Sequence, residues 1–175
     1  MSRKFFSGIN KRKQGMGNGT GKYLQGGQQV LLINKVIAKV SDVKGKGPFF
    51  IVELTVLEAL LQPDVVKEAE RYVRGEKITF MRDFQRGDDT LDDVNGFICG
   101  VAGCEPEDVS EELSDKIIGE GQPFAGMVVR VDAVTKPQKA NPSRSWTTPE
   151  WITMDADEQK QAKKKYAAWL AEQVA

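Results

Sequence analysis

Apolar and polar residues alternate along several stretches of the chain, which is the pattern of strands with one buried face. In one of them Phe50, Val52 and Leu54 share a face and polar residues occupy the other. Residues 43–48, rich in glycine and lysine, predict a turn that joins the first two strands as a β-hairpin. Pro149 interrupts the last stretch, and proline disfavours a strand interior. The predicted strands cover residues 29–41, 49–57, 76–84, 127–134 and 145–154.

Between these strands, apolar residues recur every three or four positions, which predicts helices. A short helix is predicted within residues 63–75, where a proline opens the segment and a glycine closes it. Two more helices are predicted over residues 90–102 and 106–119. Thr90 and Asp93 have the spacing of a capping pair for the first of these two.

Residues 155–175 predict a C-terminal amphipathic helix. Asp155 and Glu158 have the spacing of a capping pair at its start. Tyr166 and Trp169 fall on one side of it, so we expect the helix to dock on another part of the chain or on a partner through Trp169.

The element order is strand, strand, short helix, strand, two helices, strand, strand. It is the order of an OB-fold, a partly open five-stranded Greek-key β-barrel that often binds oligonucleotides. The 175 residues suffice for one core. We therefore expect an α+β protein with an OB-fold-like barrel, inserted helices and a C-terminal helix. Its parts are a flexible, basic, glycine-rich arm over residues 1–28, the OB-fold-like domain over 29–154 and the helix over 155–175.

The composition removes several classes of function. The chain contains no histidine, so a His-based triad, the usual general base and the commonest metal ligand are missing. Cys99 and Cys104 lie within one predicted helical region and supply neither a disulfide framework nor a four-cysteine zinc site. No apolar run reaches the roughly 20 residues of a membrane helix, and residues 1–8 lack the apolar core of a signal peptide. We expect a cytoplasmic protein with no membrane association, no metal and no cofactor.

The zero net charge conceals a segregation of charge along the chain. Residues 1–50 carry ten lysines and arginines against the single acid Asp42, while residues 88–121 carry eleven acids against the single base Lys116. This asymmetry favours a polyanion near one part of the surface and its repulsion elsewhere. The alternative is that the two segments neutralise each other. The acids at 88–93 lack the spacing and the glycine of a calcium loop, and helix capping and a solvated face account for them.

The glycine-rich segment 17–23 resembles a phosphate-binding loop, but its register is wrong. Met16 stands where that motif needs a glycine, and Tyr23 stands where it needs a serine or threonine for magnesium. No βαβ unit surrounds the segment, so a dinucleotide site is not expected either. Because a convincing carboxylate pair is also missing, we expect the protein not to be an enzyme.

Basic and aromatic residues are distributed over the strands and turns as single-strand binding requires. Such binding combines a positive groove that tracks phosphates with flat side chains on which bases stack. The candidates for phosphate contacts are Lys22, Lys35, Lys39, Lys44, Lys46, Lys77, Arg82, Arg86, Lys136, Lys139 and Arg144. The candidates for base stacking are Tyr23, Phe49, Phe84 and Trp146. Phe84 and Trp146 are more often core residues than stacking platforms, and scattered lysines on a solvated strand are also ordinary.

Short glycine-aromatic patterns accompany this element order. They are Gly21-Lys22-Tyr23-Leu24, the run from Gly45 to Leu54, Gly75-Glu76-Lys77-Ile78-Thr79-Phe80, the stretch Val94 to Ala102, and Phe124-Ala125-Gly126-Met127-Val128-Val129. Over residues 21–154 the chain resembles a group of bacteriophage OB-fold proteins that bind single-stranded DNA during replication and recombination. The resemblance implies a viral protein that coats exposed strands in the infected host cell, with replication or recombination proteins as further partners. Such proteins commonly end in an acidic tail, whereas this chain ends in a mixed-charge helix with Lys163-Lys164-Lys165.

The alternative is a structural role as a phage virion or assembly protein. In that case the barrel is a scaffold, the N-terminal arm contacts a neighbouring subunit of a homo-oligomer, and the acidic helices meet basic arms. Affinity for oligonucleotides distinguishes the two functions.

Overall fold

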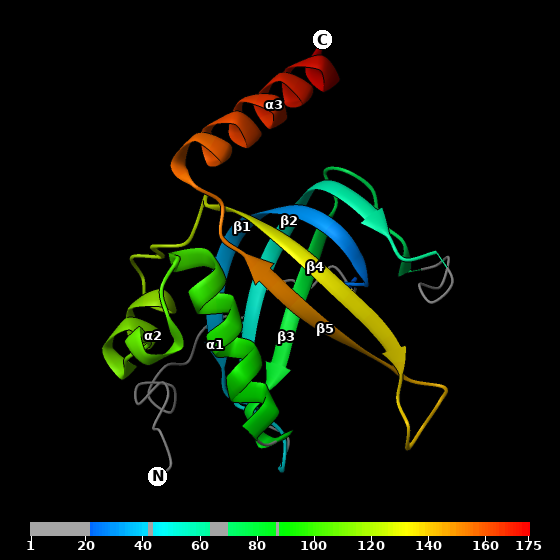
Figure 1. Ribbon diagram of the computed structural model, residues 1–175, viewed down its shortest axis with the longest axis vertical. Coiled ribbons are helices and arrows are strands. Elements are labelled where there is room, and N and C mark those ends of the chain that lie inside the picture. Colours follow the sequence, from blue (N-terminus) through cyan, green and yellow to red (C-terminus); the bar gives the residue numbers. More distant parts are fainter. Residues whose placement is uncertain (1–21, 42–43, 64–69, 87) are drawn as a thin grey trace.

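The computed structural model describes residues 22–41, 44–63, 70–86 and 88–175. Within these ranges the chain is an α+β protein with a five-stranded antiparallel sheet and three α-helices (Figure 1). The five predicted strands are confirmed, with bounds that differ by a few residues. They are β1 (Gly27–Lys39), β2 (Phe49–Leu61), β3 (Lys77–Asp83), β4 (Val128–Pro137) and β5 (Ser145–Ile152).

The helices between β3 and β4 are also present, although they begin elsewhere than predicted. They are a short 3₁₀ turn, η3 (Phe84–Arg86), then α1 (Asp88–Ala102), a second turn, η4 (Pro106–Asp108), and α2 (Glu111–Ile117). Thr90 and Asp93 are not the capping pair that the sequence predicts, because both lie inside α1. Thr90 Oγ1 donates to the carbonyl oxygen of Asp83 instead, at 3.0 Å. Residues 64–69 of the helix predicted within 63–75 lie outside the described ranges, and residues 71–75 are not helical.

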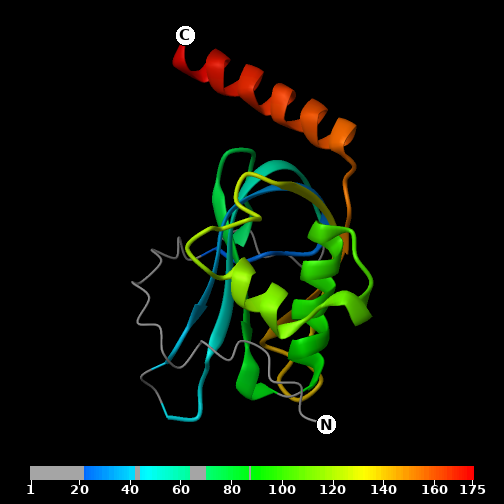
Figure 2. The same ribbon diagram turned by 90° about the vertical axis from the view of Figure 1, so that its left-hand side faces the viewer.

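The strand order β3-β2-β1-β4-β5 makes the long strand β1 the centre of the sheet. β1 pairs with β2 along its length, and its first half, Gly27–Leu32, also pairs with β4. Two register irregularities, at Val30/Leu31 and Ile33/Lys35, interrupt the ladder between β1 and β2. Such irregularities bend a strand and increase its twist. The sheet therefore curves, so that β4 and β5 pass in front of the other strands in Figure 1 and the curvature is seen from the side in Figure 2.

The two edge strands, β3 and β5, approach each other without forming a ladder in the described part of the chain. A side-chain bridge joins them, because Arg82 Nη2 on β3 donates to the carbonyl oxygen of Thr147 on β5 at 2.7 Å. The ring centres of Phe80 on β3 and Trp151 on β5 lie 5.1 Å apart. The sheet is thus not closed by hydrogen bonds, and the OB-fold-like barrel expected from the sequence stays a prediction.

Helix α1 covers the inner face of the sheet and supplies the centre of the core. Phe97 on α1 contacts Phe50 and Trp151, with ring centres 5.7 and 4.9 Å away in edge-to-face arrangements. Gly100 lets the helix approach β5 closely, since a Cβ at this position would stand 2.7 Å from the carbonyl oxygen of Trp151. Aromatic side chains of this kind dominate the burial of apolar surface, so α1 is fixed against the gap between β3 and β5.

The predicted C-terminal helix is confirmed as α3 (Ala156–Val174), which projects from the end of β5 in both views (Figures 1 and 2). Asp155 and Glu158 form the expected capping box, each side chain accepting from the backbone N–H of the other residue. Trp169 docks on the body of the protein, where a Cβ at Gly75 would stand 2.5 Å from its ring. No helix within the described ranges has the length and apolar character to cross a membrane.

Candidate nucleic-acid interface

A pocket of about 320 Å³ lies where the two edge strands meet. It brings together four residues that the sequence analysis selected from distant parts of the chain. These are Tyr23, Arg82, Arg86 and Trp146. The remaining lining comes from neighbours of these residues on the same strands and from Glu70, namely Leu24, Gln25, Glu70, Thr79, Phe80, Met81, Ser145 and Thr147.

Tyr23 is placed by a short parallel bridge on the outer edge of β3. Leu24 N donates to Thr79 O, and Thr79 N donates to Lys22 O, both at 2.9 Å. The side chain of Leu24 is buried in the core and anchors the segment, whereas Tyr23 remains 49% exposed. A half-exposed tyrosine on a fixed backbone offers a flat face to a ligand.

Lys22 does not join the pocket as a free cation. Its Nζ forms an ion pair with Glu76 at 2.7 Å and donates to the carbonyl oxygen of Arg71 at 2.9 Å. The hydrogen bonds to Lys22 and Val73 and the charge of Lys22 hold the pKa of the Glu76 carboxyl below its ordinary value, with a small opposing effect of burial. Lys22 therefore positions the segment that carries Tyr23.

Arg82 occupies the inner face of β3, as the alternation with Ile78 and Phe80 predicts, and is only 8% exposed. Its Nε pairs with the Asp93 carboxylate on α1 at 2.6 Å, and its Nη1 donates to the carbonyl oxygen of the preceding residue, Met81. Burial lowers the pKa of the guanidinium, and the hydrogen bond and charge of Asp93 oppose that effect. Because these groups already occupy its donors, Arg82 is unsuited to the phosphate contact that the sequence analysis assigned to it.

Arg82 instead supports an aromatic platform. Its guanidinium carbon lies 4.4 Å from the centre of the Trp146 ring and 4.5 Å from that of Phe80. Trp146 is half-buried and lines the pocket together with Tyr23. Arg86, which is exposed at the end of η3, adds a cation at the rim.

A second group of predicted residues surrounds the hairpin between β1 and β2. Lys44 and Lys46 are exposed in its turn, and Phe49 is half-buried at the start of β2. The register places Lys39, Phe49 and Asp83 opposite one another on β1, β2 and β3. Directly opposed residues share a face of the sheet, so Phe49 lies on the outer face between a cation and an acid.

The outer face also connects this hairpin with the pocket. Lys35 on β1 is opposite Glu53 on β2, Glu53 is opposite Thr79 on β3, and Thr79 bridges to Tyr23. The row therefore crosses the sheet from an exposed lysine to the exposed tyrosine.

A third group follows the end of β4 and the loop into β5. Lys136, Lys139 and Arg144 are all exposed there. Lys136 pairs in register with Trp146, so the loop begins and ends beside the aromatic platform. These cations are therefore accessible to an anionic ligand beside the pocket.

Besides Lys22, two of the predicted residues lie outside these groups. Phe84 is half-buried and packs against the hydrophobic core, which argues against a stacking role for its ring. Lys77 is exposed at the start of β3, opposite Thr55 on β2.

The partners that shape the pocket were not selected from the sequence. Asp93 was assigned to helix capping, and Phe80, Met81 and Thr147 carry no recognisable binding signal. The alternation along residues 76–84 places Arg82 on the same inner face as Phe80. A buried arginine needs a buried counter-charge, so this pattern is the sequence signal for a partner such as Asp93.

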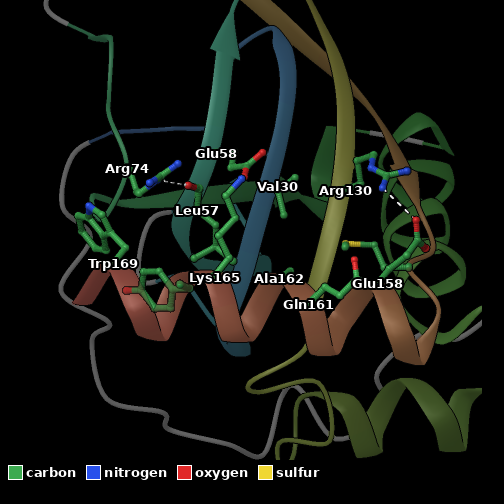
Figure 3. A pocket seen from close by; sticks show the side chains of 12 residues that line it. Val30, Leu57, Glu58, Arg74, Arg130, Glu158, Gln161, Ala162, Lys165 and Trp169 are labelled. Atoms are coloured by element: carbon green, nitrogen blue, oxygen red, sulfur yellow. Dashed lines mark hydrogen bonds and ion pairs between the residues drawn. The ribbon is translucent and has the colours of Figure 1, made fainter. Parts of the chain in front are cut away.

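A separate groove of about 280 Å³ lies between α3 and the sheet (Figure 3). Its cations are already occupied: Arg130 pairs with Glu158 at 3.1 Å, Lys165 pairs with Glu58, and Arg74 Nε donates to the carbonyl oxygen of Leu57 at 2.8 Å. The groove thus serves to attach α3 to the strands, and it is less suited to a polyanion than the pocket between the edges.

Among the side chains that the structure describes, the acids of α1, η4 and α2 are exposed apart from the paired Asp93 and the half-buried Asp115. Among the described residues no group of histidine, cysteine or acid side chains has the arrangement of a metal site. Comparison with protein-family models and with curated proteins gives no match for this sequence.

Proposed function

We propose that the protein binds single-stranded DNA without strong sequence preference and performs no chemistry on it. The observation that carries the proposal is the pairing of half-exposed Tyr23 and Trp146 in one pocket, with Arg86 at the rim. Base stacking on such rings contributes roughly 1–3 kcal/mol per base and tolerates any base, because every base has a flat face.

The arrangement of the sheet supports an OB-fold as the scaffold. OB-folds bind oligonucleotides on the face of their second and third strands, between the loops that join strands 1 and 2 and strands 4 and 5. The basic residues occupy those places: Lys44 and Lys46 lie in the β1–β2 turn, and Lys139 and Arg144 lie in the β4–β5 loop. The contact of Arg82 with Thr147 brings the edges together as an almost closed barrel would.

The bound strand would be held by two different forces. Stacking fixes bases on the rings, while lysines and arginines neutralise phosphates and release condensed counterions. The protein carries no net charge, so attraction depends on the local concentration of cations around the pocket. The exposed acids of α1 and α2 would repel the phosphates of the strand.

The biological setting follows from the resemblance described above. We propose a bacteriophage protein of the OB-fold single-stranded-DNA-binding type, which coats exposed strands during replication and recombination in the cytoplasm of the infected cell. Replication or recombination proteins are its proposed partners. The mixed charge of α3 departs from the acidic tail of that group, so recruitment by the C-terminus is not part of the proposal.

The test is a titration of the full chain with oligo-dT at several salt concentrations, followed by tryptophan fluorescence. We expect quenching that weakens steeply with salt and that is far stronger for single strands than for a duplex of equal length. Trp146→Phe should remove most of the quenching, since Trp151 is buried and Trp169, on α3, lines the separate groove between that helix and the sheet. Absence of binding at low salt, or equal affinity for duplex, would contradict the proposal; a stable oligomer without oligonucleotide affinity would favour the assembly role.

A further inference from the structure

The end of α1 brings the two cysteines of the chain together. Gly103, with φ +67°, turns the chain back, and its N–H donates to the carbonyl oxygen of Cys99 at 2.8 Å. When a left-handed glycine ends a helix, the residue that follows the glycine contacts a residue in the last turn of that helix. Here these two positions are Cys104 and Cys99. Cys104 accordingly lies on Cys99, with 3.9 Å between the two Sγ atoms.

Both thiols are free and half-buried, and both pack against the edge of the hydrophobic core. They remain partly accessible to small molecules from solvent. Within the described ranges no further cysteine, histidine or acid joins them in the arrangement of a metal site. Their geometry therefore suits chemistry between the two sulfurs.

We propose that Cys99 and Cys104 are a modification site that closes to a reversible intramolecular disulfide when the protein meets a low-molecular-weight disulfide of the glutathione class. In the first step the Cys104 thiolate attacks one sulfur of oxidised glutathione and releases one glutathione thiolate. In the second step Cys99 loses its proton to solvent and attacks Cys104 Sγ, which releases the second glutathione. The two protein thiols lose two electrons, and the glutathione disulfide gains them.

The surroundings of Cys99 affect the rate of closure. Burial raises the pKa of Cys99 to about 11, and Cys104, Glu105 and Asp108 add to the rise. The thiolate is the attacking species, so the Cys99 thiol reacts slowly at neutral pH. Closure should therefore accelerate as the pH rises.

The closed disulfide would fix the turn that leads away from α1. This turn touches the end of β5, because a Cβ at Gly103 would stand 3.3 Å from Thr153 Cγ2, and Gly100 lies against Trp151. The native fold holds the two sulfurs near each other, so the disulfide should form more readily in the native protein than in the unfolded chain. The disulfide should in turn stabilise the fold. This inference does not depend on the proposed function.

The experiment measures how strongly the native fold favours closure. The full chain is equilibrated in buffers of reduced and oxidised glutathione, with and without denaturing urea, then quenched in acid and analysed by mass spectrometry. We expect the effective concentration of the thiol pair to be about tenfold or more higher in the native protein than in the urea-unfolded chain. An equal or lower value in the native protein, or mixed glutathione disulfides as the only products, would overturn the proposal.

Two glycine variants test whether the turn is the cause. Gly103→Ala places a side chain at the left-handed position and should lower the native effective concentration several-fold. Gly126→Ala is the matched control, because Gly126 is also left-handed, with φ +83°, but has open space around it and lies away from the thiols. Gly103→Asn should retain closure, since asparagine tolerates this conformation. An equal loss of effective concentration in Gly103→Ala and Gly126→Ala would contradict a role for the turn. If Gly103→Ala fails to fold, the comparison of the native with the urea-unfolded wild-type chain still tests the proposal.

Discussion

The guanidinium of Arg82 on one edge of the sheet lies over the ring of Trp146 on the other, with 4.4 Å between its carbon and the ring centre. The same guanidinium donates to Thr147 and pairs with Asp93. A single side chain thus joins β3, β5 and α1 at the place where the sheet is open. The exposed stacking surface of Trp146 depends on this buried cation, which links the stability of the fold to the candidate binding site.

Replacing Trp146 with alanine should weaken oligo-dT binding without unfolding the protein. The loss should be about 1–3 kcal/mol, or roughly 5- to 150-fold in Kd, because one stacking platform is removed. Trp169→Ala is the matched control: this tryptophan contacts Arg74 and Gly75 in the α3 groove, and its loss should leave Kd unchanged. Both values can be measured by fluorescence anisotropy of a labelled oligonucleotide. Equal effects of the two substitutions would remove the pocket from the binding site.

Asp93→Ala should reduce the free energy of unfolding by about 3 kcal/mol, because it leaves the buried charge of Arg82 without its partner. Asp92→Ala, at the next position of α1, is exposed and should change stability by less than about 0.5 kcal/mol. Urea denaturation followed by circular dichroism compares the two. If both variants were equally stable, the ion pair could not be what holds β3 against α1.

The salt dependence of binding should report the lysines of the β1–β2 turn. Neutralising Lys44 and Lys46 together, as Lys44→Gln and Lys46→Gln, should make the plot of log K against log salt less steep by about 1.4, since each phosphate contact to a single strand contributes about 0.7. Neutralising Lys163 and Lys164 on α3 removes the same charge elsewhere and should leave the slope as it is. A similar change in both double variants would mean that only the overall charge matters.

Alanine substitutions at two glycines of α1 should change the stability of the fold in opposite directions. Gly100→Ala should destabilise the fold by about several kcal/mol, as overpacking of a core does, because the new alanine Cβ would collide with Trp151. Gly96 is exposed with open space around it, so Gly96→Ala should stabilise the helix by about 0.5–1 kcal/mol through its higher helix propensity. Thermal unfolding measures both. A stabilising Gly100→Ala would show that α1 does not pack as closely on β5 as described.

Stability should fall at alkaline pH because of Tyr72. Burial raises the pKa of this tyrosine to about 12, although hydrogen bonds to Gln25 and Gln29 act in the opposite direction. The folded state therefore holds its proton more tightly than the unfolded state, whose tyrosine has a pKa of about 10. The resulting stabilisation is complete below pH 10 and is lost towards pH 12, by about 3 kcal/mol in total. Urea titrations between these pH values should show the decrease, and Tyr72→Phe should make it shallower; an identical slope in both proteins would assign the effect to other groups.

The sequence by itself determined the strands and the C-terminal helix, because periodicity is a local property of the chain. The alternation of apolar and polar residues at 76–84 predicted both β3 and the inward position of Arg82. Even the stretch interrupted by Pro149 forms a strand, since β5 is an edge strand and lacks a second neighbour that would need the missing N–H. The capping box of Asp155 and Glu158 likewise involves residues only three positions apart.

Only the tertiary structure decided which of these elements meet. Asp93 is eleven residues from Arg82 and Thr147 is 65 residues away, and no local pattern relates the three. Their meeting depends on the bends in β1 and on the packing of Phe97 between β2 and β5, which set how far the sheet curls. The role of Arg82 differs from the predicted one for this reason. Hydrophobic periodicity shows which face of a strand is buried, but the distance between the two edges of a sheet is set by the curvature and by the side chains of the whole core.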